Sequence, residues 1–173
     1  MGPLAGRSSS LRKHVIISLC SVLALITGVV ESWFPLPFPG MRLGIANVFP
    51  LSLLILLGPG SAVAVAALRL CLAFFLSGNM FPLACSFGGL MLSLPVSITL
   101  RVKFRNALSV PAISVASAFA FNMGQVAAVV LLTGEPSVAA YLPILLAVAA
   151  PTGLAVGKLA EALATRLEKA GIR

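Results

Sequence analysis

Acidic side chains are nearly missing from this sequence: it has no aspartate, and four glutamates supply all of its side-chain carboxylates. Charged residues of both signs make up only 9% of the 173 residues. The chain also shows no carboxylate pair, no cluster of metal ligands, no nucleophile beside a base and no glycine-rich phosphate loop. These absences exclude the usual catalytic constellations. We therefore predict that the protein is not an enzyme and needs no metal or cofactor.

Hydrophobic residues, in contrast, make up 60% of the chain, and the mean hydropathy is +1.11. Soluble domains do not reach such values. Because a helix of about 20 apolar residues spans a bilayer, we predict an all-α membrane protein with one six-transmembrane-helix bundle in residues 14–157. The predicted helices cover residues 14–33, 43–58, 62–77, 81–100, 108–132 and 138–157. Residues 1–13 are expected to form a disordered cytoplasmic N-terminus, and residues 158–173 a cytoplasmic amphipathic helical tail on the membrane surface.

The net charge of +8 is concentrated between the apolar segments. Ten of the twelve lysines and arginines lie before the first predicted helix, between the fourth and the fifth, or after the sixth. Short loops rich in these residues stay in the cytoplasm. The pattern predicts a multi-pass protein of the plasma membrane with both termini in the cytoplasm. It indicates contact with the lipid bilayer and not with nucleic acid.

A proline-rich turn precedes the second predicted helix. Three prolines alternate within residues 35–39, which favours a stiff, extended connector. The helix that follows is short and is interrupted by Pro50, as are the broken helices that line binding sites in transporters. We predict that Arg42 and Asn47, at the start of this helix, face a ligand pocket that opens outward beneath the turn.

Two charged residues fall inside predicted membrane helices, where an isolated arginine costs about 2.5–3.5 kcal/mol. Arg69 lies near the middle of the third helix, and Glu31 lies near the outer end of the first. One interpretation is a permanent ion pair that locks the two helices together. Another is that Arg69 faces a cavity and binds an anionic or carbonyl-bearing ligand. The third is that its side chain extends to the membrane surface.

The fifth predicted helix carries a polar stripe that ends in Asn122 and Gln125. Residues three apart share one face of a helix, so the stripe points inward. Its amides either form hydrogen bonds between helices or line a cavity. A series of small residues, Cys20, Ala24 and Gly28, runs along the first helix. Such a series allows close helix contact, either inside the bundle or with a partner.

Several segments together resemble the Gx transporter family, which is also labelled heptaprenyl diphosphate synthase component I. The resemblance rests on residues 31–35 and 39–47, on Arg69, and on residues 77–78 and 122–125. The family is similar to the S components of energy-coupling factor (ECF) transporters, which have six helices and cytoplasmic termini. Relatives commonly carry a histidine immediately before the asparagine of the fifth helix, where this chain has Phe121.

The resemblance implies two functions. The first is a substrate-binding membrane component for uptake of a small hydrophobic or prenyl- or quinone-related molecule. Its partners would be an energy-coupling transmembrane subunit with ATPases, docked on the face of Cys20, Ala24 and Gly28. The alternative is a noncatalytic membrane subunit of a heptaprenyl diphosphate synthase that supports menaquinone side-chain synthesis beside a catalytic prenyl synthase chain. The aspartate-rich motifs of such synthases are absent from this sequence. A purely structural role in a redox membrane complex also stays open.

Overall fold

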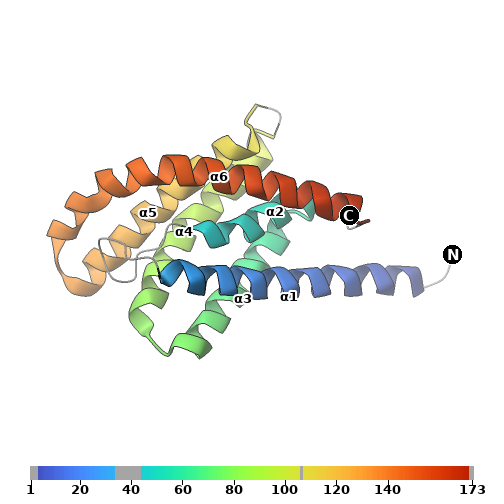
Figure 1. Ribbon diagram of the computed structural model, residues 1–173, viewed down its shortest axis with the longest axis horizontal. Helices are drawn as coiled ribbons and strands as arrows, with labels where there is room; N and C mark the ends of the chain where they lie inside the picture. The colour runs from blue at the N-terminus through green and yellow to red at the C-terminus, as the bar shows by residue number, and fades with distance from the viewer. Residues whose placement is uncertain (1–3, 34–43, 106, 172–173) are drawn as a thin grey trace.

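The computed structural model describes residues 4–33, 44–105 and 107–171, and all regular elements within these residues are helices. The predicted turn at residues 35–40 and Arg42 lie outside them. In chain order the elements are α1 (Leu4–Ser32), the 3-10 helix η1 (Ile45–Asn47), α2 (Val48–Leu56), α3 (Pro59–Ser77), α4 (Met80–Lys103), α5 (Val110–Thr133), the 3-10 helix η2 (Pro136–Tyr141) and α6 (Leu142–Lys169) (Figure 1).

Five segments of the described chain are long and apolar enough to cross a membrane. They are Leu11–Glu31, Pro59–Leu76, Met80–Lys103, Val110–Thr133 and Pro136–Lys169. A further apolar segment, Ile45–Leu56, is shorter. At 1.5 Å per residue it extends about 18 Å, against a hydrocarbon core of about 30 Å. The all-helical membrane fold therefore agrees with the prediction, whereas the sixth membrane crossing stays a prediction.

Local sequence explains where the long helices end. Gly78 takes a left-handed conformation with φ of 57°, which closes α3 without a side-chain clash. The side chain of Asn79 then accepts a hydrogen bond from the backbone N–H of Phe81 and caps α4. Gly134, with φ of 71°, closes α5 in the same way. The break predicted between the helices of residues 62–77 and 81–100 is confirmed.

The start of the chain differs from the prediction, whereas the helical tail at its end agrees with it. Residues 4–13 are helical and continuous with α1, where disorder was expected. Extending an existing helix is far easier than nucleating a new one, and residues 4–13 contain no proline. At the other end, α6 runs unbroken from Leu142 through Pro151 to Lys169. Ala160 and Ala164 of this last part are buried, so the tail continues the sixth helix and packs on the protein.

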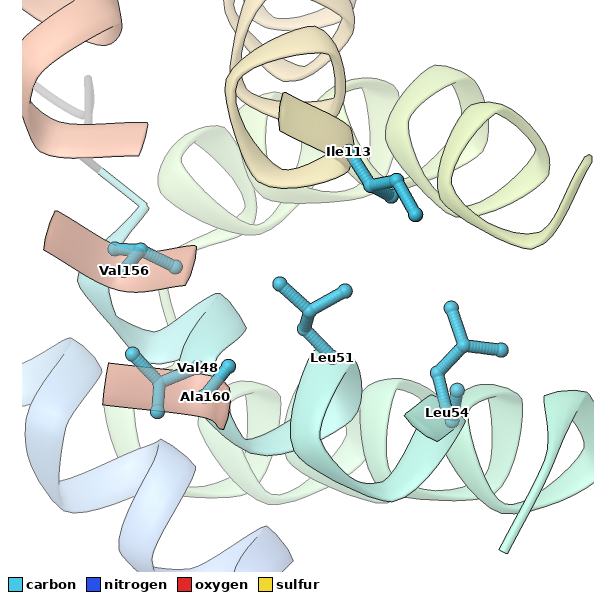
Figure 2. Close-up of a cluster of buried hydrophobic side chains, with 7 residues drawn as sticks. Val48, Leu51, Leu54, Ile113, Val156 and Ala160 are labelled. Carbon is cyan, nitrogen blue, oxygen red and sulfur yellow. The ribbon is translucent and has the colours of Figure 1, made fainter. Parts of the chain in front are cut away.

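The helices pack in two groups that meet at α2. α5 lies between α4 and α6, while α1 and α2 pack against α3 (Figure 1). Apolar side chains of α2 face α5 and α6 across a shared core (Figure 2). The labelled members of this core are Val48, Leu51, Leu54, Ile113, Val156 and Ala160. The short second helix is thus held between α6 on one side and α3 on the other.

The small residues of α1 pack inside the bundle. Cys20 is 4% exposed, Ala24 is 0% exposed, and both belong to a core cluster with Leu53 of α2 and Val65 of α3. Gly28 is buried as well. The prediction that this face docks an external partner is therefore wrong. The four-residue spacing defines a stripe on α1, but the bulky Leu53 fills the groove from within the same chain.

Candidate functional site

Four residues from three elements meet where the chain enters α2. Glu31, at the end of α1, accepts a hydrogen bond from the backbone N–H of Gly44. Asn47, the last residue of η1, accepts one through Oδ1 from Nη1 of Arg69 on α3, at 3.1 Å. The backbone N–H of Asn47 donates to the carbonyl oxygen of Gly44 at 2.9 Å. We call these four residues the polar junction.

The glycine of the polar junction has a specific backbone role. Gly44 adopts φ of 85°, a left-handed conformation that side chains rarely tolerate, and it immediately precedes η1. A Cβ atom there would lie 3.2 Å from Nδ2 of Asn47. The first N–H groups of a helix lack partners within that helix, so the carboxylate of Glu31 acts as an acceptor for this helical start. Gly44 thus permits the left-handed turn before η1, and the carboxylate of Glu31 accepts the hydrogen bond from the N–H group of this turn.

Both charged members of the polar junction are withdrawn from solvent. Glu31 is 2% exposed and Arg69 is 1% exposed. An arginine that reached the membrane surface would leave its head group accessible, so this third interpretation of Arg69 is excluded. Opposite charges that share a buried cluster offset part of each other's cost of desolvation. A direct ion pair between Glu31 and Arg69 stays a prediction.

A small cavity adjoins the polar junction. Its volume is about 30 Å³. A water molecule needs a cavity of at least about 10–15 Å³ by this measure, so this cavity has room for about two waters. Its polar lining consists of Asn47 and four serines from α4 and α5, namely Ser93, Ser97, Ser114 and Ser117. Any larger ligand would require the helices to move apart.

Part of this serine lining serves helix packing. Ser117 of α5 donates a hydrogen bond to the backbone carbonyl of Ser93 on α4 at 3.2 Å. Ser97 donates to the carbonyl of Leu94 within its own helix at 2.9 Å. The bond from Ser117 links two helices, which is the packing role that such groups have in membranes. The cavity therefore combines packing hydroxyls with the side chain of Asn47.

The two amides of α5 are buried but do not bond to the polar junction. Asn122 is buried, and Gln125 is 0% exposed. Within the described residues, neither amide atom of Gln125 has a hydrogen-bond partner. The structure thus joins two of the predicted ligand residues, Asn47 and Arg69, in one hydrogen bond. The contribution of Asn122 and Gln125 to a common pocket stays a prediction.

Phe121 is a site residue that the sequence analysis did not select. Its ring is buried, lines the small cavity and belongs to a core cluster with Ala66 of α3 and Leu90 of α4. The ring sits against Gly89, where a Cβ atom would come within 2.7 Å of it. The one sequence signal was its position beside Asn122. Phe121 fills space that a smaller side chain would leave open to the cavity.

The buried amide of Gln125 leads to a stability prediction. We expect Gln125→Met to raise the free energy of unfolding by about 1–3 kcal/mol, because it removes a buried group without hydrogen bonds and keeps the side-chain length. The measurement is denaturant-induced unfolding in detergent micelles. Gln125→Glu is the matched control and should lower stability, since it buries a charge at the same place. A loss of 1 kcal/mol or more in Gln125→Met would show that the amide has a bound partner.

The fold and the site define a class: a helical, multi-pass membrane protein whose buried polar junction and serine-lined cavity lie between its helices. Comparison with known protein families then identifies the family. Residues 20–163 match the family model of heptaprenyl diphosphate synthase component I, so the chain belongs to this family. Searches among curated proteins and among solved structures returned no significant match. The family resemblance seen in the sequence is thereby confirmed.

Proposed function

We propose that the protein is the noncatalytic membrane subunit of a heptaprenyl diphosphate synthase and acts with a separate catalytic prenyl synthase chain. The observation that carries this proposal is the family match, which runs from α1 into the last turns of α6. The growing product has a charged head and an increasingly apolar tail, and such a tail favours an apolar environment over water. A membrane-embedded subunit places the catalytic chain where that product can partition.

The proposal also specifies how the protein is oriented in the membrane. Both termini lie in the cytoplasm of the plasma membrane, on the side where precursors of prenyl chains are charged and soluble. Support comes from the clustering of lysines and arginines in three segments of the chain. It also comes from Figure 1, in which the first turns of α1 and the last turns of α6 lie at the same end of the molecule.

The proposed ligand contacts are the six residues selected from the sequence. They are Glu31, Arg42, Asn47, Arg69, Asn122 and Gln125. The hydrogen bond between Arg69 and Asn47 supports a role for two of them in one site. Burial of Asn122 and Gln125 supports a role in the interior. Ligand entry requires the cavity of about 30 Å³ to widen.

Uptake of a prenyl- or quinone-related molecule is the second candidate. One observation favours it: the cavity lies beside a short helix that starts at a polar turn, as in transporters with broken helices. One observation weakens it, because the small-residue face proposed for a coupling subunit is packed against α2 and α3. The membrane subunit of a synthase therefore ranks first.

The test is reconstitution of the protein with the catalytic chain in lipid vesicles. We expect the rate of heptaprenyl diphosphate formation from labelled isopentenyl diphosphate to rise severalfold when the protein is present, without ATP. Asn122→Leu should reduce this stimulation. Met123→Leu is the matched control on the next residue of α5, whose side chain is 50% exposed, and it should behave as wild type.

Two outcomes would contradict the proposal. The first is synthesis that is equally fast with and without the protein. The second is ATP-dependent uptake of a prenyl or quinone precursor into vesicles that hold this protein and a complete coupling module, with no effect on synthesis. The second outcome would establish the transport candidate instead.

A further inference from the structure

A second cavity lies where the ends of α2 and α4 meet the last turns of α6. Its volume is about 300 Å³, which is at the lower end for ligand pockets in proteins. Its lining includes Arg101 and Arg105 at the end of α4, and Glu161, Thr165 and Glu168 of α6. Apolar residues such as Ile55 complete the lining. We call this space the charged-end cavity.

The two arginines of this cavity have no partner within the described chain. Arg101 lies in the last turn of α4, and Arg105 follows two residues after the end of the helix. Neither makes a hydrogen bond or an ion pair with a described residue, and the carboxylate of Glu161 makes no ion pair there either. The guanidinium groups of Arg101 and Arg105 and the carboxylate of Glu161 thus line the same cavity of about 300 Å³ and form no ion pair with one another.

The charges at this end do more than orient the protein in the membrane. A topology signal requires positive charge near the membrane but does not require any particular direction of the side chains. Lys103 lies between the two arginines in sequence, is exposed and does not line the cavity. Two cations of three therefore share one cavity with acidic residues from another helix. A general basic surface would not gather cations and carboxylates around one cavity. The arrangement is therefore that of a binding site.

The length of α4 relates this cavity to the head-group layer of a bilayer. Arg101 is 21 residues beyond Met80, the first residue of α4. That separation is about 32 Å along the helix axis, close to the thickness of the hydrocarbon core. With the start of α4 at one membrane surface, the cavity lies at the other. An amphipathic ligand could place its apolar part against Ile55 and its polar part among the charged side chains.

From these observations we propose that the charged-end cavity binds the zwitterionic phosphoethanolamine head group of a membrane lipid. Guanidinium groups form paired hydrogen bonds with phosphate oxygens, which suits Arg101 and Arg105. An ammonium group offers three hydrogen-bond donors and suits the carboxylate of Glu161. A purely anionic head group would meet repulsion from the acidic residues. A choline head group has no N–H donor for their carboxylates.

The test is native mass spectrometry of the full-length protein in mild detergent with three lipids of identical acyl chains. We expect phosphatidylethanolamine to be retained at least tenfold more than phosphatidylcholine or phosphatidylglycerol. The double variant Arg101→Gln, Arg105→Gln should lose this retention. Glu161→Gln should lose the preference for phosphatidylethanolamine and should raise retention of phosphatidylglycerol.

The control removes two positive charges outside the cavity. In the double variant Lys103→Gln, Lys158→Gln, lipid retention should match wild type, because neither lysine lines the cavity. An equal loss in this control would overturn the proposal and leave a nonspecific charge effect. Retention of phosphatidylglycerol equal to that of phosphatidylethanolamine in the wild-type protein would also overturn it, since a simple anion site would then explain the binding. Thermal unfolding of each variant, with Arg101→Lys as a charge-retaining substitution, separates lost binding from lost folding.

Discussion

We expect Arg69→Ala to lower the free energy of unfolding by about 3–5 kcal/mol. This is the usual cost of removing one charge from a buried cluster of opposite charges. The guanidinium group is almost completely buried and donates a hydrogen bond to Asn47. Its removal leaves the carboxylate of Glu31 in a polar junction that has lost its cation. The measurement is the unfolding free energy in detergent micelles, followed by circular dichroism.

Two comparisons make this prediction specific. Leu68→Ala changes the neighbouring residue of α3, whose side chain is 41% exposed, and should cost much less. A double-mutant cycle with Asn47→Ala should show a coupling energy of about 0.5–3 kcal/mol, since the two residues share a hydrogen bond. Additive effects of the two substitutions would contradict the polar junction as a structural unit.

The same residue separates structure from ligand binding. If Glu31 and Arg69 compensate each other's charge, Glu31→Ala and Arg69→Ala should destabilise the ligand-free protein to a similar extent. If Arg69 instead contacts a ligand, Arg69→Ala should chiefly remove the stabilisation that the ligand gives. That stabilisation is about 2.7 kcal/mol at a ligand concentration of 100 times its Kd.

Gly124→Leu is expected to prevent the native packing of α4 against α5. A Cβ atom on Gly124 would lie 2.2 Å from the backbone carbonyl oxygen of Gly88, which no side-chain rotation can relieve. Even Gly124→Ala should cost about 1–3 kcal/mol, the usual range for overpacking. The measurement is the yield of monodisperse protein after detergent extraction, together with the unfolding free energy of the alanine variant.

Gly60→Ala is the matched control for this prediction. A Cβ atom at Gly60 would meet nothing within 4 Å, and its backbone is helical. Replacing a helical glycine by alanine reduces the freedom of the unfolded chain and should leave stability unchanged or raise it by up to about 1 kcal/mol. Equal stability of Gly124→Ala and Gly60→Ala would show that α4 and α5 do not approach as closely as described.

The sequence was most informative about helices and their limits. Apolar runs identified the long helices because the bilayer requires about 20 such residues. Gly78 and Asn79 marked a break between helices correctly because the first permits a left-handed backbone and the second caps a helix. The start of α1 was misplaced because polar residues can extend a helix that apolar neighbours have already formed.

The sequence was less informative about what each face contacts. A stripe such as Cys20 and Ala24 has the same spacing whether it packs against a partner protein or against the chain's own α2. Only the position of Leu53 shows that the contact is internal. The importance of Phe121 depends on its fit against Gly89, which is distant in sequence. Arg69 could be recognised as needing a partner from its place in an apolar segment. Its bond to Asn47 depends on how α3 packs beside η1.

The shortness of α2 has an electrical consequence. Together, η1 and α2 extend about 18 Å, so the start of η1 lies well inside a bilayer when the end of α2 is at one surface. A charge that moves across a whole membrane changes energy by about 2.3 kcal/mol per 100 mV. Glu31 and Arg69 have opposite signs, so joint movement through this region would be nearly insensitive to membrane potential. A rearrangement that moved Arg69 alone would acquire a voltage dependence.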